Sequence, residues 1–410
     1  MNTKIENHKE SYLLEILLPF LGLLAPYKIF SIPFTAIALF IVLILKRSLG
    51  KFKICSANMP FIVFFAYMVI RDLFHMLFSS GVAVSSQVNR LIEYSVLYIL
   101  MFLIVDGIEE NILYRSWKIA GVIFGAGMMY HVFLLVVLNQ PITPLTIIPG
   151  YELRFDALDG HMRPTSFFAE PAAYVTSMMP LLFLALKRKD LKWVFISTFL
   201  IVVSTSTVGV ILSAVMWVLF ILFEKKSLRV TVSAILFIII FLVLFLNLEI
   251  FAESLTKFES VAEGESTFGS RVKAPFEVVG LIDWFNLPFG NTTLNIREFV
   301  MANQMDLSAA SRVLGYAQTK ENIFLNTVAQ LIYRYGIVGL VLFLMCFKGK
   351  IFNKNSKIRM YAIVLLIAAF GQGNISTPDI PMFLLLIYSF DFNNNKETPI
   401  LYPKQNCLNE

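Results

Sequence analysis

Long runs of apolar residues alternate with short polar connections along almost the whole chain. Several runs approach the ~20 residues that a helix needs to cross the roughly 30 Å apolar core of a bilayer. The pattern predicts an all-α polytopic integral membrane protein with about 11–12 transmembrane helices in a single membrane domain, residues 1–410. The expected spans are 12–26, 29–45, 59–79, 90–105, 118–138, 166–186, 192–204, 207–223, 229–248, 323–346, 358–371 and 378–391.

Two polar connections, 139–166 and 249–322, are much longer than the others. Long ordered loops between spans usually carry the residues that meet a ligand. In the larger loop, the apolar residues between Val278 and Phe285 are spaced as one face of a short amphipathic helix. This spacing favours a segment that lies at the membrane interface, with Trp284 as an aromatic anchor.

Composition and charge set the orientation. The mean hydropathy is +0.73 and only 15% of residues are charged, which excludes an ordinary soluble domain. Cytoplasmic loops retain Lys and Arg, and about 22 of the 34 basic residues fall in alternate connections and in the two tails. Both termini are therefore expected in the cytoplasm and both long loops outside. The net charge of +6 reflects this topology and predicts no nucleic-acid binding.

Signatures of common soluble enzymes are missing from the sequence. There is no Walker A motif, no dinucleotide-binding glycine pattern and no H-E-x-x-H, and the three cysteines and four histidines are too scattered for a metal cluster. We therefore expect no metal, no cofactor and no ATP-driven transport. The cysteines all fall at or beyond the expected cytoplasmic edge, so no disulfide is expected in the external loops.

The densest group of charged residues lies at the end of the 139–166 loop. Two arginines, one histidine and four carboxylates occur between Tyr151 and Glu170, and Pro171 follows. A solvated loop before a helix start is one explanation, since proline suits the first turn and a carboxylate complements the helix dipole. Glu170 follows two phenylalanines, however, and an unpaired carboxylate near the bilayer is costly. Arg163 is its expected ion-pair partner.

Four weak motifs occur in a fixed order over about residues 160–345. They are Arg163–Pro171 (R-x-x-G/S-x-F-x-E-P), Ser204–Gly209 (S-x-S/T-x-x-G), Ser270-Arg271 with Leu287–Asn291 (S-R…P-L/F-x-G), and Asn326 with Gly336–Gly339 (H-N-x9-G-x-x-G). Together they resemble the superfamily of bacterial O-antigen polymerases, related exopolysaccharide polymerases and O-antigen ligases. Leu325 departs from the pattern, because the ligases and many polymerases have histidine there. Glu321, one turn earlier, is the nearest polar substitute. Thr207 also stands where some members have arginine.

The resemblance implies a membrane glycosyltransferase that polymerises undecaprenyl-diphosphate-linked oligosaccharide repeat units into O-antigen or a related surface polysaccharide. It implies a bacterial cytoplasmic (inner) membrane location, with the long loops periplasmic or external. The implied partners are the lipid-linked oligosaccharide, the lipid bilayer, and a chain-length regulator and flippase of the same pathway. The missing histidine argues against the ligase branch, which remains the near alternative.

The implied reaction releases a diphosphate that gains negative charge as the anomeric bond breaks. The external loops hold no D-x-D motif for a metal ion, and arginine is the suitable replacement because it stays charged and grips phosphate through two donors. We expect Arg163 and Arg271 to clamp the diphosphate, with Arg154 and Arg312 as helpers.

A general base would ease attack by the sugar hydroxyl. Glu170 is the first candidate for this base and His161 the second, although Glu170 could equally orient Arg163. Trp284, Glu321 and Asn326 are the expected contacts to the glycan.

Charged residues also fall inside the expected spans, where they are usually paired and often functional. They are Arg71, Asp72, His75, Glu93, His131 and Arg334. Structural pairing, for example of Arg71 or His75 with Glu93, is the first interpretation, and contact with the substrate phosphate is the second.

A lipid-glycan flippase or secondary transporter is the alternative from another class. Transporters usually show internal repeats and paired broken helices, and residues 1–205 and 206–410 show no self-similarity. A structural scaffold fits least well, because it would not need arginines clustered in external loops.

Overall fold

The computed structural model describes the parts of the chain that contain most of the expected helices. The described residues are 12–29, 32–47, 59–78, 94–100, 108–143, 145–148, 163–223, 274–291, 325–352 and 358–371, with isolated positions at 88, 91–92, 232, 296, 299–300, 303, 384 and 386–388. Most of them are helical, and the only strands among them are the two-residue β1 (Lys28–Ile29) and β2 (Ile32–Pro33), which pair with each other. The expected helical class is confirmed for these residues.

Three of the described helical segments are long and apolar enough to cross a membrane. They are Met59–Leu77, Glu110–Val137 and Thr327–Ile351. Shorter apolar helices coincide with further expected spans at Leu13–Leu24, Phe34–Leu45, Leu191–Val203, Thr207–Phe223 and Arg359–Phe370. The expected span 229–248 lies almost entirely outside the described residues, as does much of 90–105 and 378–391.

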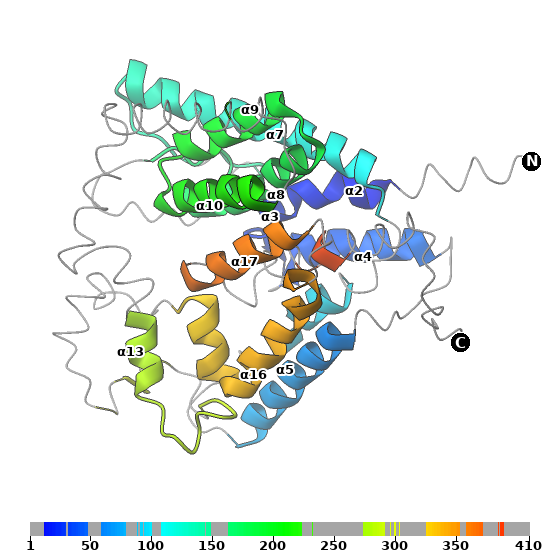
Figure 1. The fold of residues 1–410 in the computed structure, drawn as a ribbon, viewed down its shortest axis with the longest axis vertical. Helices are drawn as coiled ribbons and strands as arrows, with labels where there is room; N and C mark the ends of the chain where they lie inside the picture. The colour runs from blue at the N-terminus through cyan, green and yellow to red at the C-terminus, as the bar shows by residue number, and fades with distance from the viewer. Residues whose placement is uncertain are drawn as a thin grey trace, which may run out of the picture. The chain divides into compact units, whose positions relative to one another are not determined.

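The chain divides into two compact units, and the first comprises Met1–Lys28, Pro33–Thr35 and Ile108–Thr256. Its helices are α2 (Leu13–Leu17), the 3-10 turn η1 (Leu18–Phe20), α3 (Leu21–Leu24), α7 (Glu110–Val132), the π-helix η3 (Phe133–Val137), α8 (Pro171–Arg188), α9 (Leu191–Val203) and α10 (Thr207–Phe223). Helix α8 forms the centre, because every residue from Tyr174 to Leu186 is buried against α3, α7, α9 or α10 (Figure 1).

Local sequence explains how the helices of the first unit begin and end. Pro171 occupies the first turn of α8, as expected. The side chain of Asp190 accepts a hydrogen bond from the backbone N–H of Trp193 and so caps α9. A tight turn at Ser204–Ser206 separates α9 from α10, with Thr205 in the left-handed region at φ 55°. The first expected span is interrupted where Pro19 lies in η1, between α2 and α3.

The second unit comprises Ile29–Ile32, Ala36–Gly107 and Lys257–Glu410. Its helices are α4 (Phe34–Arg47), α5 (Met59–Phe78), α13 (Ala274–Gly280), α16 (Thr327–Ile351) and α17 (Arg359–Gly371). Helix α16 packs against α5, α13 and α17 (Figure 1). The rings of Phe64 on α5 and Phe343 on α16 are 5.5 Å apart, centre to centre.

The short helix expected in the larger loop is present, but it ends earlier and packs differently. Helix α13 stops at Gly280, and turns follow as far as Phe289. Val278 and Ile282 are buried in an apolar cluster with Tyr333 of α16, so these residues belong to the protein core and not to an interfacial face. Trp284, by contrast, is 83% exposed and remains available to lipid or glycan.

Candidate functional site

Two of the motif stretches in the second unit meet through their backbones. Helix α16 is broken at Gly336, whose φ of 69° and ψ of −172° lie outside the helical region. The backbone N–H groups freed by this break turn to the Leu287–Asn291 stretch. Ile337 N donates to Leu287 O at 3.0 Å, and Val338 N donates to Pro288 O at 3.1 Å. The larger loop therefore supplies the carbonyl acceptors for the N–H groups that the break in α16 leaves without intrahelical partners.

Glycine is required on both sides of this contact. Gly290 has φ 92°, and a Cβ atom built there would lie 2.3 Å from the carbonyl oxygen of Arg334. A Cβ atom on Gly336 would lie 2.2 Å from the carbonyl oxygen of Pro288. Real Cβ atoms do not approach other atoms so closely, and these φ values disfavour residues with a side chain. The two glycines of the motifs thus allow the two backbones to touch.

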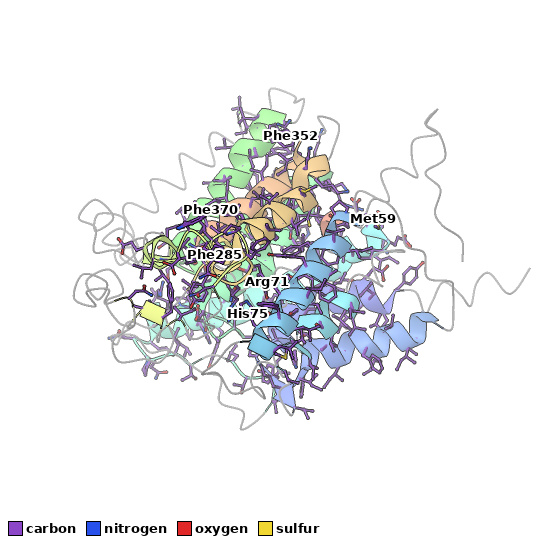
Figure 2. The ribbon with its side chains drawn as sticks, turned by 90° about the horizontal axis from the view of Figure 1, so that it is seen from below. Met59, Arg71, His75, Phe285, Phe352 and Phe370 are labelled. Carbon is purple, nitrogen blue, oxygen red and sulfur yellow. The ribbon has the colours of Figure 1, made fainter. Side chains whose placement is uncertain are left out.

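Two basic side chains of α5, Arg71 and His75, which are labelled in Figure 2, reach the same contact. The Arg71 Nη2 atom donates to the carbonyl oxygen of Gly290 at 3.3 Å, and the His75 Nε2 atom lies 3.3 Å from the carbonyl oxygen of Arg334. Arg71 Nη2 is also 3.4 Å from His75 Nε2. Because Nε2 holds at most one proton, it can donate to the carbonyl or accept from Arg71, but not both.

The guanidinium groups of Arg71 and Arg334 lack carboxylate partners among the described residues. Arg334 is only 6% exposed, and the Nε atoms of both side chains have no hydrogen-bond acceptor there. The neighbouring carboxylate of Asp72 is engaged elsewhere, because it accepts hydrogen bonds from the hydroxyls of Tyr94 and Tyr335. A buried positive charge without a counter-charge is costly. This cationic cluster, Arg71, His75 and Arg334, is therefore suited to accept an anion.

In the first unit, the middle of the Arg163–Pro171 motif is held by His131. The ring Nδ1 atom accepts hydrogen bonds from the backbone N–H groups of Thr165 (3.3 Å) and Ser166 (3.2 Å), so Nδ1 carries no proton. The Ser166 hydroxyl donates to Phe124 O at 2.8 Å, and its backbone takes a positive φ of 56°. Phe168 is buried against Phe124 at a ring distance of 5.1 Å. These inner motif residues fix the turn that precedes α8.

The ends of the same motif are more accessible. Arg163 is half-buried, and Glu170 is exposed at the N-cap position of α8, where its side chain makes no capping hydrogen bond. The ion pair expected between the two does not form. Among the described side chains, salt bridges join Glu110 to Lys187 and to Arg188. Glu170 therefore keeps a carboxylate that is open to solvent or to a ligand.

The remaining expected site residues are only partly placed. Asn326 is fully buried, and its Oδ1 atom accepts a hydrogen bond from Ala329 N at 2.9 Å, which caps α16. Leu325 is buried in the apolar cluster around Val278. The expected residues that lie outside the described part of the chain are Arg154, His161, Arg271, Arg312, Glu321 and Glu93.

In the sequence, the members of the cationic cluster could be recognised only as charged residues inside the expected spans. All three are unusual inside apolar runs. Arg71 and His75 lie one turn apart on α5, but Arg334 follows His75 by 259 positions, and no local pattern predicts that it meets them. Within the described ranges, no three His, Cys, Asp or Glu side chains are grouped as metal ligands. Comparisons of the whole chain with protein-family models, curated proteins and solved structures give no match.

Proposed function

We propose that the chain is a polytopic protein of the bacterial cytoplasmic membrane that polymerises undecaprenyl-diphosphate-linked oligosaccharide repeat units. Its 11–12 spans would place both termini in the cytoplasm and the loops 139–166 and 249–322 outside. The three membrane-length apolar helices, and the shorter ones that coincide with further expected spans, support a polytopic membrane protein.

The proposed reaction type depends on one observation: two motif stretches meet beside arginines that have no carboxylate partner among the described residues. Leu287–Asn291 and the broken helix at Gly336 belong to the resemblance to O-antigen polymerases, and they touch through backbone hydrogen bonds. Arg71 and Arg334 lie at that contact without carboxylate partners in the described residues. The resemblance implies a lipid-diphosphate substrate, so we assign its diphosphate as the anion that binds at this contact.

In the proposed reaction, the anomeric C–O bond between the growing glycan and its lipid diphosphate breaks. A hydroxyl oxygen of the next lipid-linked unit forms the new glycosidic bond, its proton passes to a base, and the lipid diphosphate leaves. Arg163 and Arg271, helped by Arg154 and Arg312, stabilise the charge on the leaving group. Within the second unit, the proposed role of the cationic cluster is contact with a substrate phosphate.

Glu170 is the proposed base, with His161 as the second candidate. The exposed, unpaired carboxylate of Glu170 supports this role, because a base must reach a substrate proton. Exposed Trp284 is suited to stack on a sugar face. Asn326, whose Oδ1 caps α16, is the weakest of the proposed glycan contacts, and Glu321 stays a prediction.

A lipid-glycan flippase or transporter is the second candidate, and the broken helix α16 is the feature that favours it. Discontinuous helices often surround transporter substrate sites. The O-antigen ligase alternative loses support at Leu325, which is buried among apolar residues and offers no titratable group.

Deletion of the encoding gene, followed by a gel of surface glycan, separates the candidates. Loss of the ladder with one repeat unit still attached supports the polymerase. Loss of all attached glycan, with polymer accumulating on the carrier lipid, indicates a ligase. An unchanged ladder refutes both.

Complementation with point variants then tests the arginine clamp. Arg163→Ala and Arg271→Ala should each abolish the ladder at normal expression, whereas Lys192→Ala, which removes an exposed cation on α9, should restore it. Long polymer in both arginine variants contradicts the clamp.

A further inference from the structure

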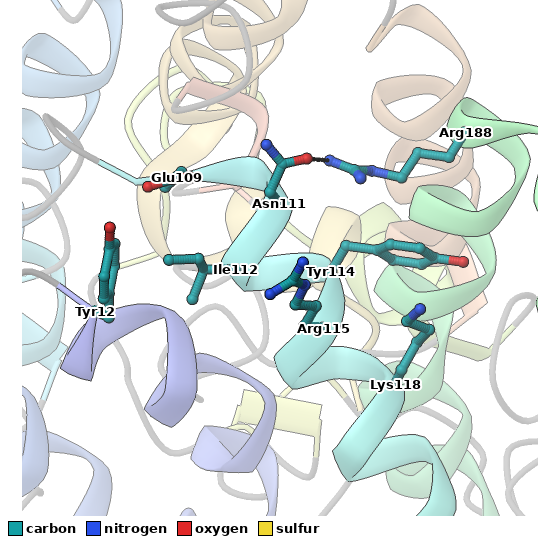
Figure 3. A pocket seen from close by; sticks show the side chains of 8 residues that line it. All are labelled: Tyr12, Glu109, Asn111, Ile112, Tyr114, Arg115, Lys118 and Arg188. Atoms are coloured by element: carbon teal, nitrogen blue, oxygen red, sulfur yellow. Dashed lines mark hydrogen bonds between the residues drawn. The ribbon is translucent and has the colours of Figure 1, made fainter.

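A cavity of about 540 Å³ lies beside the first turns of α7, in the first unit (Figure 3). Ligand sites in proteins usually measure about 300–1,000 Å³. Its walls come from three places: the residue before α2, the start of α7 and the end of α8. The lining residues are Tyr12, Glu109, Asn111, Ile112, Tyr114, Arg115, Lys118 and Arg188.

Positive charge exceeds negative charge in this lining. Arg188 is engaged, since its Nη2 atom donates to Asn111 Oδ1 at 2.7 Å and its Nε atom lies 3.5 Å from Glu110 Oε1. Arg115 and Lys118 form no ion pair with any described residue, and Glu109 is the one carboxylate among the lining residues. The cavity therefore has two positive charges available for an anion.

An aromatic ring holds two of these cations apart. The Lys118 Nζ atom is 4.8 Å from the centre of the Tyr114 ring, and the Arg188 guanidinium carbon is 5.0 Å from the same centre. Figure 3 shows the ring between the two side chains. Cation–π contacts of this kind position a positive charge without neutralising it. Lys118 is thereby oriented by the protein and still able to bind an anion.

The position of the cavity on α7 indicates where that anion comes from. Helix α7 with η3 is long and apolar enough to cross a membrane, and the cavity lies at its polar N-terminal end. A membrane-spanning α7 would place this end at the level of lipid headgroups. Ile119 and Val122 follow Arg115 by four and seven positions, so they share its helical face. Each is 60% exposed. A lipid with its headgroup in the cavity would lay its acyl chain along this face.

We infer that this cavity binds the phosphate headgroup of an anionic phospholipid, with Arg115 and Lys118 as its charge contacts and the Ile119–Val122 face of α7 against an acyl chain. Basic recesses at the ends of membrane helices are suited to such headgroups. None of the lining residues is assigned to sugar transfer, so the lipid site does not depend on that activity.

Native mass spectrometry of the full chain in neutral detergent measures this binding directly. Phosphatidylglycerol is compared with phosphatidylcholine of the same acyl chains, and the affected variant is Arg115→Gln with Lys118→Gln. Each basic residue near an anionic headgroup contributes about a fivefold change in affinity, so the pair should weaken phosphatidylglycerol binding roughly 30-fold. A matched control, Lys192→Gln with Lys348→Gln, removes two exposed cations elsewhere and should leave it unchanged.

A charge-conserving variant, Arg115→Lys with Lys118→Arg, should bind within a fewfold of the wild type and guards against loss of binding through misfolding. Equal affinity of the wild type and the glutamine variant for phosphatidylglycerol overturns the inference. So does equal affinity of the wild type for the two lipids. Inorganic phosphate that displaces phosphatidylglycerol at comparable concentration shows a free-anion site and overturns the lipid assignment.

Discussion

The contact between the broken helix α16 and the larger loop can be tested by one added methyl group. In Gly336→Ala the new Cβ atom would lie 2.2 Å from the carbonyl oxygen of Pro288 and 2.5 Å from the backbone nitrogen of Gly290. Both neighbours are backbone atoms, which cannot rotate away as a side chain does. The two segments must separate, or α16 must change its path.

The size of the effect follows from two separate terms. A φ of 69° with a ψ of −172° lies in a region that is essentially restricted to glycine, and a residue with a side chain there costs about 1–3 kcal/mol. Forcing an extra carbon into a packed contact costs about 1–3 kcal/mol more. The expected loss is therefore about 2–6 kcal/mol, a large part of the ~5–15 kcal/mol net stability of a typical domain.

The same helix provides a matched control. Gly349 also lies in α16, but a Cβ atom there meets nothing within 4 Å. Gly349→Ala should be neutral or should stabilise the helix by up to about 1 kcal/mol, because alanine is the better helix former. Both variants are purified in the same detergent, and their unfolding midpoints in denaturant are compared with the wild type.

Equal midpoints for Gly336→Ala and Gly349→Ala would show that the contact with Pro288 contributes no stability and would contradict the expected loss. Gly290→Ala supplies an independent check from the other side of the contact, where φ is 92°. The double variant Gly290→Ala with Gly336→Ala should lose less stability than the two single losses added together, because the first substitution already separates the segments.

Three further predictions concern neighbouring polar groups. Arg334→Met should raise the free energy of unfolding by about 1–4 kcal/mol, because it removes a buried charge without a partner in the described residues, and it should lower the polymer yield. A less stable variant would show that the charge is compensated. Asn326→Ala should lower the free energy of unfolding by about 1 kcal/mol, whereas Asn326→Ser should leave it unchanged, since serine also caps helices. A stable serine variant that makes no polymer would indicate that Asn326 contacts the glycan. Asp72→Ala should lower the free energy of unfolding by about 1–3 kcal/mol, because it removes the acceptor of the hydrogen bonds from the hydroxyls of Tyr94 and Tyr335. Tyr335→Phe removes only one of these two hydrogen bonds and should have the smaller effect in the same unfolding assay.

Features that depend on local sequence could be predicted, and features that depend on distant contacts could not. The apolar run 207–223 coincides with α10, and the turn at Ser204–Ser206 separates it from α9, because hydrophobic periodicity and turn residues act over a few positions. The break at Gly336 depends on backbone atoms about 50 positions earlier in the chain, at Leu287 and Pro288. The sequence pattern marks this glycine but does not show its partner.

The candidate site was predicted unevenly for the same reason. Glu170 is exposed before α8, as the position before Pro171 suggested, but its ion pair with Arg163 is absent. Glu170 has an extended backbone at the N-cap of α8, and Ser166, between the two residues, turns the chain with a positive φ of 56°. The junction of Arg71, His75 and Arg334 required the packing of α5 on α16, which no local pattern encodes.

The motif residues divide into those that build the fold and those that remain free to act. Ser166 fixes a turn, Gly290 and Gly336 let two backbones touch, and Asn326 caps a helix, so each has a structural reason to be present. Residues of this kind explain why a resemblance in motif order reports architecture more directly than chemistry. Any catalysis must then depend on groups whose charge the fold leaves uncompensated or exposed. Arg334 and Glu170 meet that condition, which makes them sharper tests of the proposed glycosyl transfer than the motif glycines.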